Sequence, residues 1–371
     1  MDEYLTNTTF EEQAELCWLH RLNFKKNGIL NDMKRAGLRP AELYKMKPER
    51  VHRIFEPQTA KIILDMQRED CYGEFERIKR QGIRFIASGD ADFPACLRNI
   101  IKPPASIYLI GRLPDPKVYS VGVVGARLCS EYGRYMARYY GGGLGRVGVQ
   151  VISGMADGID GISQRAALKE GGYSLGVLGC GVDVIYPASN RDLYDQLSAE
   201  GGILSEYPPK TAARSSLFPQ RNRLIAALSD ALLVVEARKK SGTLITASLA
   251  LEMGRDVYAV PGRVDEALSF GCNNLIHEGA GIALGLREFL SELPIFCNPD
   301  AKNNPSAAAN LAGSPAADPY AALKKCIGVH GLTAEEIAMK LKLPMSDVLC
   351  LLCDAELEEV VVCRGGKYCL E

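Results

Sequence analysis

The sequence predicts an α/β protein built on a doubly wound, mostly parallel β-sheet. Between residues 118 and 285, a short apolar run, a glycine-containing turn and a helix-like segment recur about every 25 to 30 residues, as in consecutive βαβ units. The apolar runs show no alternation with polar residues, which is typical of parallel strands covered on both faces. We therefore expect an extended Rossmann-like core. Its strands are predicted at residues 118–124, 149–153, 174–178, 202–205, 231–236, 256–260 and 281–284.

Other segments flank this core. Residues 1–70 carry apolar residues at helical spacing, interrupted by glycine and proline, and predict a small helical domain of the SAM or helix-hairpin-helix type. The main domain is expected at residues 71–296, with its core at 118–285. Residues 297–319 are rich in Asn, Ala, Ser and Pro and predict a flexible linker. Residues 320–371 predict three helices and a strand pair, the order of a winged-helix-like domain.

The charge balance requires any polyanion site to be local. The chain has 371 residues, of which 44 are basic and 45 acidic, so no overall field draws it to nucleic acid or to a membrane. No run approaches the roughly 18 apolar residues of a membrane span, and the first residues lack the pattern of a signal peptide. We expect a cytoplasmic protein without a membrane partner.

Cysteine and histidine usage points away from metal and nucleophilic chemistry. Twelve cysteines without a signal peptide predict reduced thiols that pack in the core. Cys350 and Cys353 have C-x-x-C spacing, but Cys363 and Cys369 follow at a spacing that suits zinc poorly. The four histidines form no recognisable Ser-His-Asp or Cys-His arrangement. The sequence therefore predicts no catalytic residue, no metal and no cofactor.

Glycine-containing turns follow the first three core strands and are candidates for an anion site. In open parallel sheets, ligands bind beyond the carboxyl ends of the strands, close to helix N-termini. The first turn contains Arg127, a forked phosphate donor, and Ser130, a candidate helix cap. The next two turns contain Gly154 and Gly181. The glycine-rich residues 141–145 precede a strand rather than follow one, and we interpret them as a helix terminator.

Positive charge is concentrated between residues 210 and 240, where seven basic and two acidic residues give a net charge of +5. Residues 218–223 (FPQRNR) are expected to end a long loop, immediately before a helix at 224–229. Arginine at a helix start opposes the helix dipole unless an anion binds there, which favours phosphate contacts by Arg221 and Arg223. Phe218 offers a face on which a base stacks.

The same segment has a structural interpretation as well. In that alternative, the two arginines bond to loop carbonyls and to Glu206 or Glu236.

A second helix start follows the fifth core strand, at Lys240, Ser241 and Gly242, and extends the candidate edge.

Seven blocks in this order resemble the DNA-processing protein A family, also named DprA or Smf. They are VVGARLCSEYG, SGMADGID, LGCGVDVIYP, ILSEYP, FPQRNRLIAALSDALLVVEA, SGTLITASLALEMGRDVYAVPG and GCNNLIHEGA. The resemblance implies a protein that binds and protects single-stranded DNA, forms homodimers and loads RecA recombinase during natural transformation, without catalytic turnover. By position, it implies a DNA-binding set of Arg127, Ser130, Phe218, Arg221, Asn222, Arg223, Ser241 and Gly242, and in addition Arg214 and Lys240.

The sequence departs from the family pattern in three places. Ser163 and Gln164 stand where Ala-His is common, and no basic residue follows Pro187, where one is frequent. Arg191 is a candidate replacement for that charge. Residues 1–70 also lack the Gly-Ile-Gly hairpin of a helix-hairpin-helix module, so the sequence leaves open whether that domain contacts DNA.

Two other functions are compatible with the sequence. Rossmann-type nucleotide-binding enzymes that resemble phosphoribohydrolases also place a Gly-Thr turn at a helix start, but the glutamate of their block is missing after Thr243. A binder of a signalling nucleotide is the other alternative.

Residues 318–371 contain six basic and nine acidic residues, a net charge of −3, which predicts a partner-binding or autoinhibitory role for the winged-helix-like domain rather than DNA contact.

Overall fold

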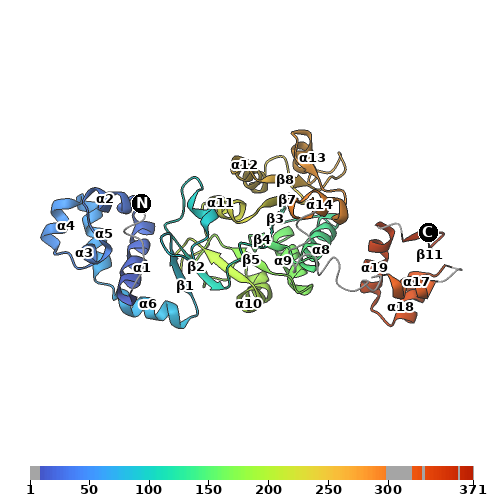
Figure 1. The fold of residues 1–371 in the computed structure, drawn as a ribbon, viewed down its shortest axis with the longest axis horizontal. Helices are drawn as coiled ribbons and strands as arrows, with labels where there is room; N and C mark the ends of the chain where they lie inside the picture. The colour runs from blue at the N-terminus through green and yellow to red at the C-terminus, as the bar shows by residue number, and fades with distance from the viewer. Residues whose placement is uncertain (1–8, 298–319, 328–330, 358–359, 371) are drawn as a thin grey trace. The chain divides into compact units, whose positions relative to one another are not determined.

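The computed structural model describes residues 9–297, 320–327, 331–357 and 360–370 (Figure 1). The chain forms two compact units, Met1–Asn303 and Asn304–Glu371. None of the described helices combines the length and the apolar composition that crossing a membrane requires.

A nine-stranded sheet forms the centre of the first unit, in the order β1-β2-β6-β5-β4-β3-β7-β8-β9. The strands β3 to β9 pair in parallel, whereas β1 and β2 are antiparallel additions beside β6. The predicted α/β class and doubly wound parallel core are confirmed. The strands are β1 Arg84–Ala87, β2 Ser106–Gly111, β3 Ser120–Val124, β4 Gln150–Ser153, β5 Ser174–Val177, β6 Gly202–Ser205, β7 Ala231–Val234, β8 Asp256–Ala259 and β9 Gly281–Ile282.

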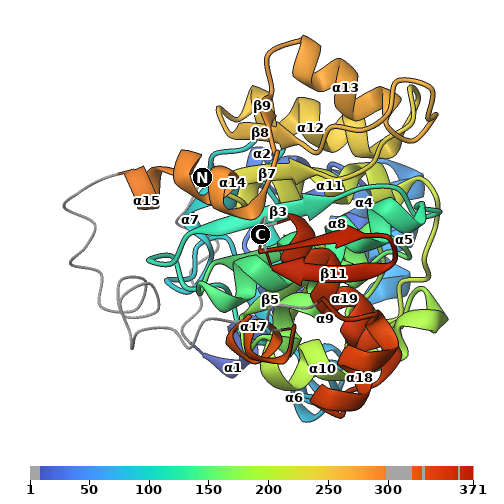
Figure 2. The same cartoon turned by 90° about the vertical axis from the view of Figure 1, so that its right-hand side faces the viewer.

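Helices cover both faces of this sheet, and in both views α12 and α13 lie on the side opposite α10 (Figure 2). Leu232 and Val234 of β7 pack with α11, α12 and α13, while Ala231 and Leu233 pack with α8, α9 and α14. Because both faces of the sheet are covered, the sequence of β7 is apolar at every position and does not alternate with polar residues. The helices are α7 Ala95–Arg98, α8 Glu131–Arg146, α9 Ile159–Lys169, α10 Arg191–Glu200, α11 Leu217–Leu228, α12 Gly242–Glu252, α13 Phe270–His277, α14 Leu286–Glu292 and α15 Pro294–Cys297, with a 3-10 turn at Ala188–Asn190.

Six helices precede the sheet in the described residues, and five of them lie within residues 10–70, where the helical spacing predicts helices. Thr9 caps the first of them in a capping box with Glu12, and prolines begin three others because their missing N–H has no partner at a helix start. The helices share one apolar cluster with β1, β2 and α10, so they belong to the same compact unit as the sheet. The domain boundary at residue 70 stays a prediction. The helices are α1 Phe10–Lys25, α2 Ile29–Arg35, α3 Pro40–Tyr44, α4 Pro48–Ile54, α5 Pro57–Gln67 and α6 Cys71–Arg80.

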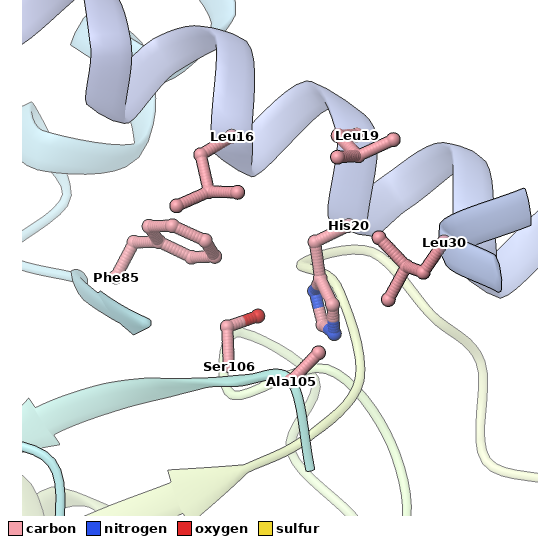
Figure 3. Close-up of a pocket in the computed structure, with 7 residues that line it drawn as sticks. All are labelled: Leu16, Leu19, His20, Leu30, Phe85, Ala105 and Ser106. Carbon is pink, nitrogen blue, oxygen red and sulfur yellow. The ribbon is translucent and has the colours of Figure 1, made fainter. Parts of the chain in front are cut away.

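A small pocket lies where α1 packs on the sheet, and His20 points into it (Figure 3). The imidazole Nδ1 lies 3.3 Å from the hydroxyl of Tyr108 in β2, and the thiol of Cys17 lies 3.5 Å from the same hydroxyl. Burial lowers the pKa of His20 to about 4, because the charged imidazolium loses its hydration there. His20 is therefore neutral in the folded protein near pH 7.

This burial predicts a pH dependence of stability. Between pH 6.5 and pH 4 the unfolded chain protonates His20 while the folded chain does not, so the free energy of unfolding decreases as the pH falls through this range. The expected loss is up to about 3 kcal/mol. Urea denaturation of the wild type and of His20→Gln at pH 7, 5.5 and 4 measures it. The two proteins should differ in the slope of stability against pH; equal slopes would mean that His20 titrates normally.

One predicted boundary is wrong. Residues 218–223 do not end a loop, because α11 begins at Leu217 and includes them. Pro219 occupies the first turn of α11, where a missing N–H costs nothing and the ring is tolerated. Phe218 and Arg221 are therefore fixed on one helix, three residues apart.

The glycines at 141–145 are not a terminator, because α8 continues through them to Arg146. An added Cβ at Gly141 would lie 2.7 Å from the Cα of Ser163, and one at Gly145 would lie 2.6 Å from the carbonyl oxygen of Ala167. The glycines thus allow the backbones of α8 and α9 to approach closely. Sequence alone does not distinguish this role from a helix end, since both require glycine.

The second unit has the predicted order of three helices and a hairpin: α17 Ala321–Ile327, α18 Ala334–Leu341, α19 Met345–Leu357, β10 Val361–Arg364 and β11 Lys367–Leu370. The predicted linker lies outside the described residues except at Cys297. The prediction of core thiols is wrong for Cys350, Cys353 and Cys363, which are exposed. Cys350 and Cys353 lie outside the buried face of α19, which Val348 and Leu352 form, and Cys363 lies in β10. Within the described residues, no cluster of His, Cys, Asp and Glu could hold a metal ion.

Candidate nucleic-acid interface

The candidate site lies at the carboxyl ends of β3 to β8, which we call the strand-end edge. From β3 the chain first builds β4, β5 and β6 on one side and then crosses to β7, β8 and β9 on the other. Strand order reverses at β3, and ligands of open α/β sheets bind in the crevice outside such a point. The turn after β3 and the start of α11 both lie there, although they are distant in sequence.

Arg127 and Phe218 come together at this point. The guanidinium carbon of Arg127 lies 5.0 Å from the centroid of the Phe218 ring, the geometry of a cation–π contact. Arg127 is exposed, and among the described residues it has no acidic partner within 4.0 Å. An exposed guanidinium without a counter-ion is available for phosphate. The β3 turn and the FPQRNR segment, which are distant in the sequence, thus meet in the structure.

Phe218 is held from below by the turn after β5. A Cβ added at Gly179 would lie 2.8 Å from the Phe218 ring, so only glycine leaves room for the aromatic side chain. Tyr186 flanks the same ring, with centroids 5.4 Å apart and planes inclined by 33°, and its side chain is 41% exposed. Tyr186 was not among the predicted site residues. Its position in a strand-end turn is the signal that could have identified it.

Arg221 is buried beneath this aromatic pair rather than turned to solvent. It is 3% exposed, and its Nη1 donates to the carbonyl of Val177 at 2.8 Å. Burial lowers its pKa, and the neighbouring Asp160 carboxylate acts in the opposite direction. Burial likewise raises the pKa of Asp160, which accepts from the N–H of Gly154 at 3.1 Å. In this conformation Arg221 supports the site through buried contacts, and it has no exposed surface that a phosphate could contact.

Arg223 and Asn222 also have partners within the protein. Arg223 donates to Glu206 at 2.6 Å, with only 14% of its side chain exposed. The Asn222 amide donates to the carbonyl of Gly242 at 3.3 Å and so connects α11 to the start of α12. The structural alternative for the arginine pair, with bonds to a carbonyl and to Glu206, describes both arginines in this structure.

Ser130 is engaged as well. Its backbone N–H donates to Glu236 at 3.0 Å, its hydroxyl donates to the same carboxylate, and the hydroxyl accepts from the N–H of Gly133 at 3.0 Å as the cap of α8. Glu236 is 2% exposed, so this contact fixes the β3 turn to the end of β7. Ser130 therefore shapes the turn that presents Arg127.

The glycine turns also contribute by shape. Gly154 and Gly181 are buried, and their N–H groups donate to Asp160 and to the carbonyl of Thr211 respectively. A Cβ at Gly154 would overlap Arg221. Neither N–H is free for an anion in this structure. Both turns let other parts of the chain approach closely.

Exposed cations without an acidic partner among the described residues lie in the segments that follow the strands at the strand-end edge. They are Arg127, Arg191, Arg214, Arg238, Lys239 and Lys240. Lys210 pairs with Glu74, by contrast, and Arg263 pairs with Asp265. Ser241 caps α12 through the N–H of Thr243, and the space around Gly242 is open. The edge thus combines unpaired positive charge with two partly exposed rings, the combination that binds single-stranded nucleic acid without sequence preference.

Comparison with known proteins agrees with the resemblance seen in the sequence blocks. The family model described as DNA recombination-mediator protein A matches residues 84–294. Protein Smf of Synechocystis sp. is 39% identical over 237 residues, which cover 63% of this chain and 60% of that protein. The chain therefore matches about three fifths of the length of this relative.

Two solved structures are similar in fold. The structure of DNA processing protein A from Streptococcus pneumoniae is 30% identical with a TM-score of 0.64, and the match covers 78% of this chain and 99% of that chain. DNA processing protein A from Helicobacter pylori, whose structure is described for its single-stranded DNA binding mode, is 28% identical with a TM-score of 0.51 and is covered to 94%. The match to the family model spans more than half of the sequence, and the chain belongs to the DNA recombination-mediator protein A family.

Proposed function

We propose that this protein binds single-stranded DNA along the strand-end edge and delivers it to RecA recombinase during natural transformation. The observation that carries the proposal is the exposed, unpaired Arg127 beside the Phe218 and Tyr186 rings. The Arg127 guanidinium binds the phosphate backbone, and the two rings stack on bases. The single-stranded DNA binding mode described for the Helicobacter pylori relative supports this choice of ligand.

The division of labour within the predicted residue set follows from burial. Arg127 contacts phosphate directly, together with the exposed Arg214 and Lys240. Arg221, Arg223, Asn222 and Ser130, together with the glycines at 154 and 181, hold the turns in place. Gly242 and Ser241 leave the start of α12 open to the backbone of the strand. Strand protection, homodimer formation, a cytoplasmic location and the absence of turnover belong to the same proposal and rest on the family.

Salt-dependent titration tests the proposal against its rivals. The logarithm of the affinity for oligo-dT should fall linearly with the logarithm of the salt concentration, with a slope of about −0.7 for each phosphate contacted. Mononucleotides should compete poorly, because one phosphate reaches only part of the edge. Tight binding of a mononucleotide, or release of a base from one, would favour a nucleotide-binding enzyme or a nucleotide sensor instead.

A further inference from the structure

We infer that the N-terminal helical region takes part in strand binding through Phe24 of α1, which positions the start of α11. The inference rests on the proposed function and goes beyond it, because it assigns a role to a segment outside the proposed set of DNA-binding residues. Phe24 is a positioning residue, and the group that it acts on is Tyr207.

The first step is the attachment of α1 to the sheet. Cys17 and His20 both meet the hydroxyl of Tyr108 in β2, at 3.5 Å and 3.3 Å, and all three side chains are buried. Phe24 follows His20 by four residues and therefore lies on the same face of the helix. The position of Phe24 relative to the sheet is thus determined by buried contacts one turn earlier.

The second step is the contact between Phe24 and the segment that leads from β6 to α11. The Phe24 ring lies edge-on to the ring of Tyr207, with centroids 5.7 Å apart and planes inclined by 60°. Tyr207 is 4% exposed, and its hydroxyl donates to the carbonyl of Leu217 at 3.2 Å. Leu217 is the first residue of α11 and precedes Phe218. One aromatic side chain therefore connects α1 to the helix that carries the base-stacking ring.

The third step is a second connection from the helical region to the same segment. Lys210 pairs with Glu74 of α6 at 3.3 Å, and its N–H donates to Asp183 at 2.7 Å. Arg223 of α11 reaches back to Glu206, the residue before Tyr207. The segment at 206–216 is thus held between two helices on one side and α11 on the other.

Such contacts matter for binding because Phe218 must meet Arg127 and the strand together. Aromatic stacking and a charge-assisted bond both weaken when their partners shift, and an unrestrained segment adds an ordering cost to binding. Loss of the Phe24 ring should therefore lower affinity without removing a phosphate contact.

The test compares Phe24→Ala with Phe10→Ala in the full chain. Phe10 is also a partly exposed ring of α1, but it packs against Phe75 at 5.3 Å, whereas Phe24 contacts Tyr207. Phe24→Ala should lower the affinity for oligo-dT about three- to tenfold, leave the salt slope unchanged and be rescued by Phe24→Tyr. Phe10→Ala should leave affinity unchanged. Equal effects of the two alanine variants would overturn the inference.

A readout that needs no DNA accompanies the titration. Trypsin cleavage after Lys210 and Arg214, both exposed, should be faster in Phe24→Ala than in Phe10→Ala at equal overall stability. Tyr207→Phe should give the same phenotype, and its effect should not add to that of Phe24→Ala. Unchanged cleavage or full additivity would overturn the inference, whereas failure of the wild type to bind oligo-dT would instead overturn the proposed function.

Discussion

Replacing Arg127 by alanine is expected to weaken oligo-dT binding ten- to a hundredfold, the largest loss from any single exposed side chain. The guanidinium has no acidic partner among the described residues, so its whole hydrogen-bonding capacity is available to phosphate. Hydrogen bonds to charged groups contribute about 1.5 to 3 kcal/mol. The loss should be the same for oligo-dT and oligo-dC, because backbone contacts carry no base code. Fluorescence anisotropy over a range of salt concentrations measures both affinity and slope.

The salt slope separates a lost phosphate contact from a disturbed fold. Arg127→Ala should reduce the magnitude of the slope by about 0.7, the share of one phosphate on a single strand. Arg138→Ala is the matched control, since Arg138 is an exposed arginine in the middle of α8, away from the strand-end edge. That variant should bind as the wild type does. An Arg127 variant with unchanged affinity would mean that the strand runs elsewhere.

The sheet was predictable because its signals are local. Each parallel strand is a short apolar run bounded by turn residues, and the observed strands fall within the predicted ranges to within a few positions. Strand-end turns from distant parts of the sequence must then meet at one edge, so the proximity of Arg127 and Phe218 follows from topology. Helix starts are less secure, and α11 shows this, since Pro219 is compatible both with a loop and with a first turn.

The orientation of the arginines could not be predicted, because it depends on partners that are distant in sequence. Arg221 turns inward toward Asp160 and the carbonyl of Val177, and Arg223 turns toward Glu206. All of these positions were consistent with phosphate contact when only charge and spacing were known. Tyr186 was missed for a related reason, since a single aromatic residue in a turn acquires meaning only beside the Phe218 ring.

Gly154→Ala is expected to lower the free energy of unfolding of the first unit by about 3 kcal/mol or more. The new Cβ would overlap Nη1 of Arg221 and would lie 2.5 Å from the Asp160 carboxylate. Both side chains are buried, so one must leave its hydrogen-bond partner, and an uncompensated buried charge is costly. Phe218 lies over Arg221, with its ring centroid 6.0 Å from the guanidinium carbon, and should lose order with it. Thermal and urea denaturation measure the first effect, and oligo-dT affinity measures the second.

Gly242→Ala is the matched control, because Gly242 also follows a strand at the same edge and begins a helix. No heavy atom lies within 4 Å of its added Cβ, and its φ is not positive, so this variant should stay within about 0.5 kcal/mol of the wild type. If both alanine variants were equally stable, Arg221 and Asp160 would have room that the structure does not show. A Gly154→Ala variant that is less stable yet binds oligo-dT normally would show that strand binding does not depend on the buried Arg221 and Asp160. The expected result is a loss of both stability and oligo-dT affinity, because the Arg221 guanidinium lies beneath the Phe218 ring and beside the buried Asp160 carboxylate.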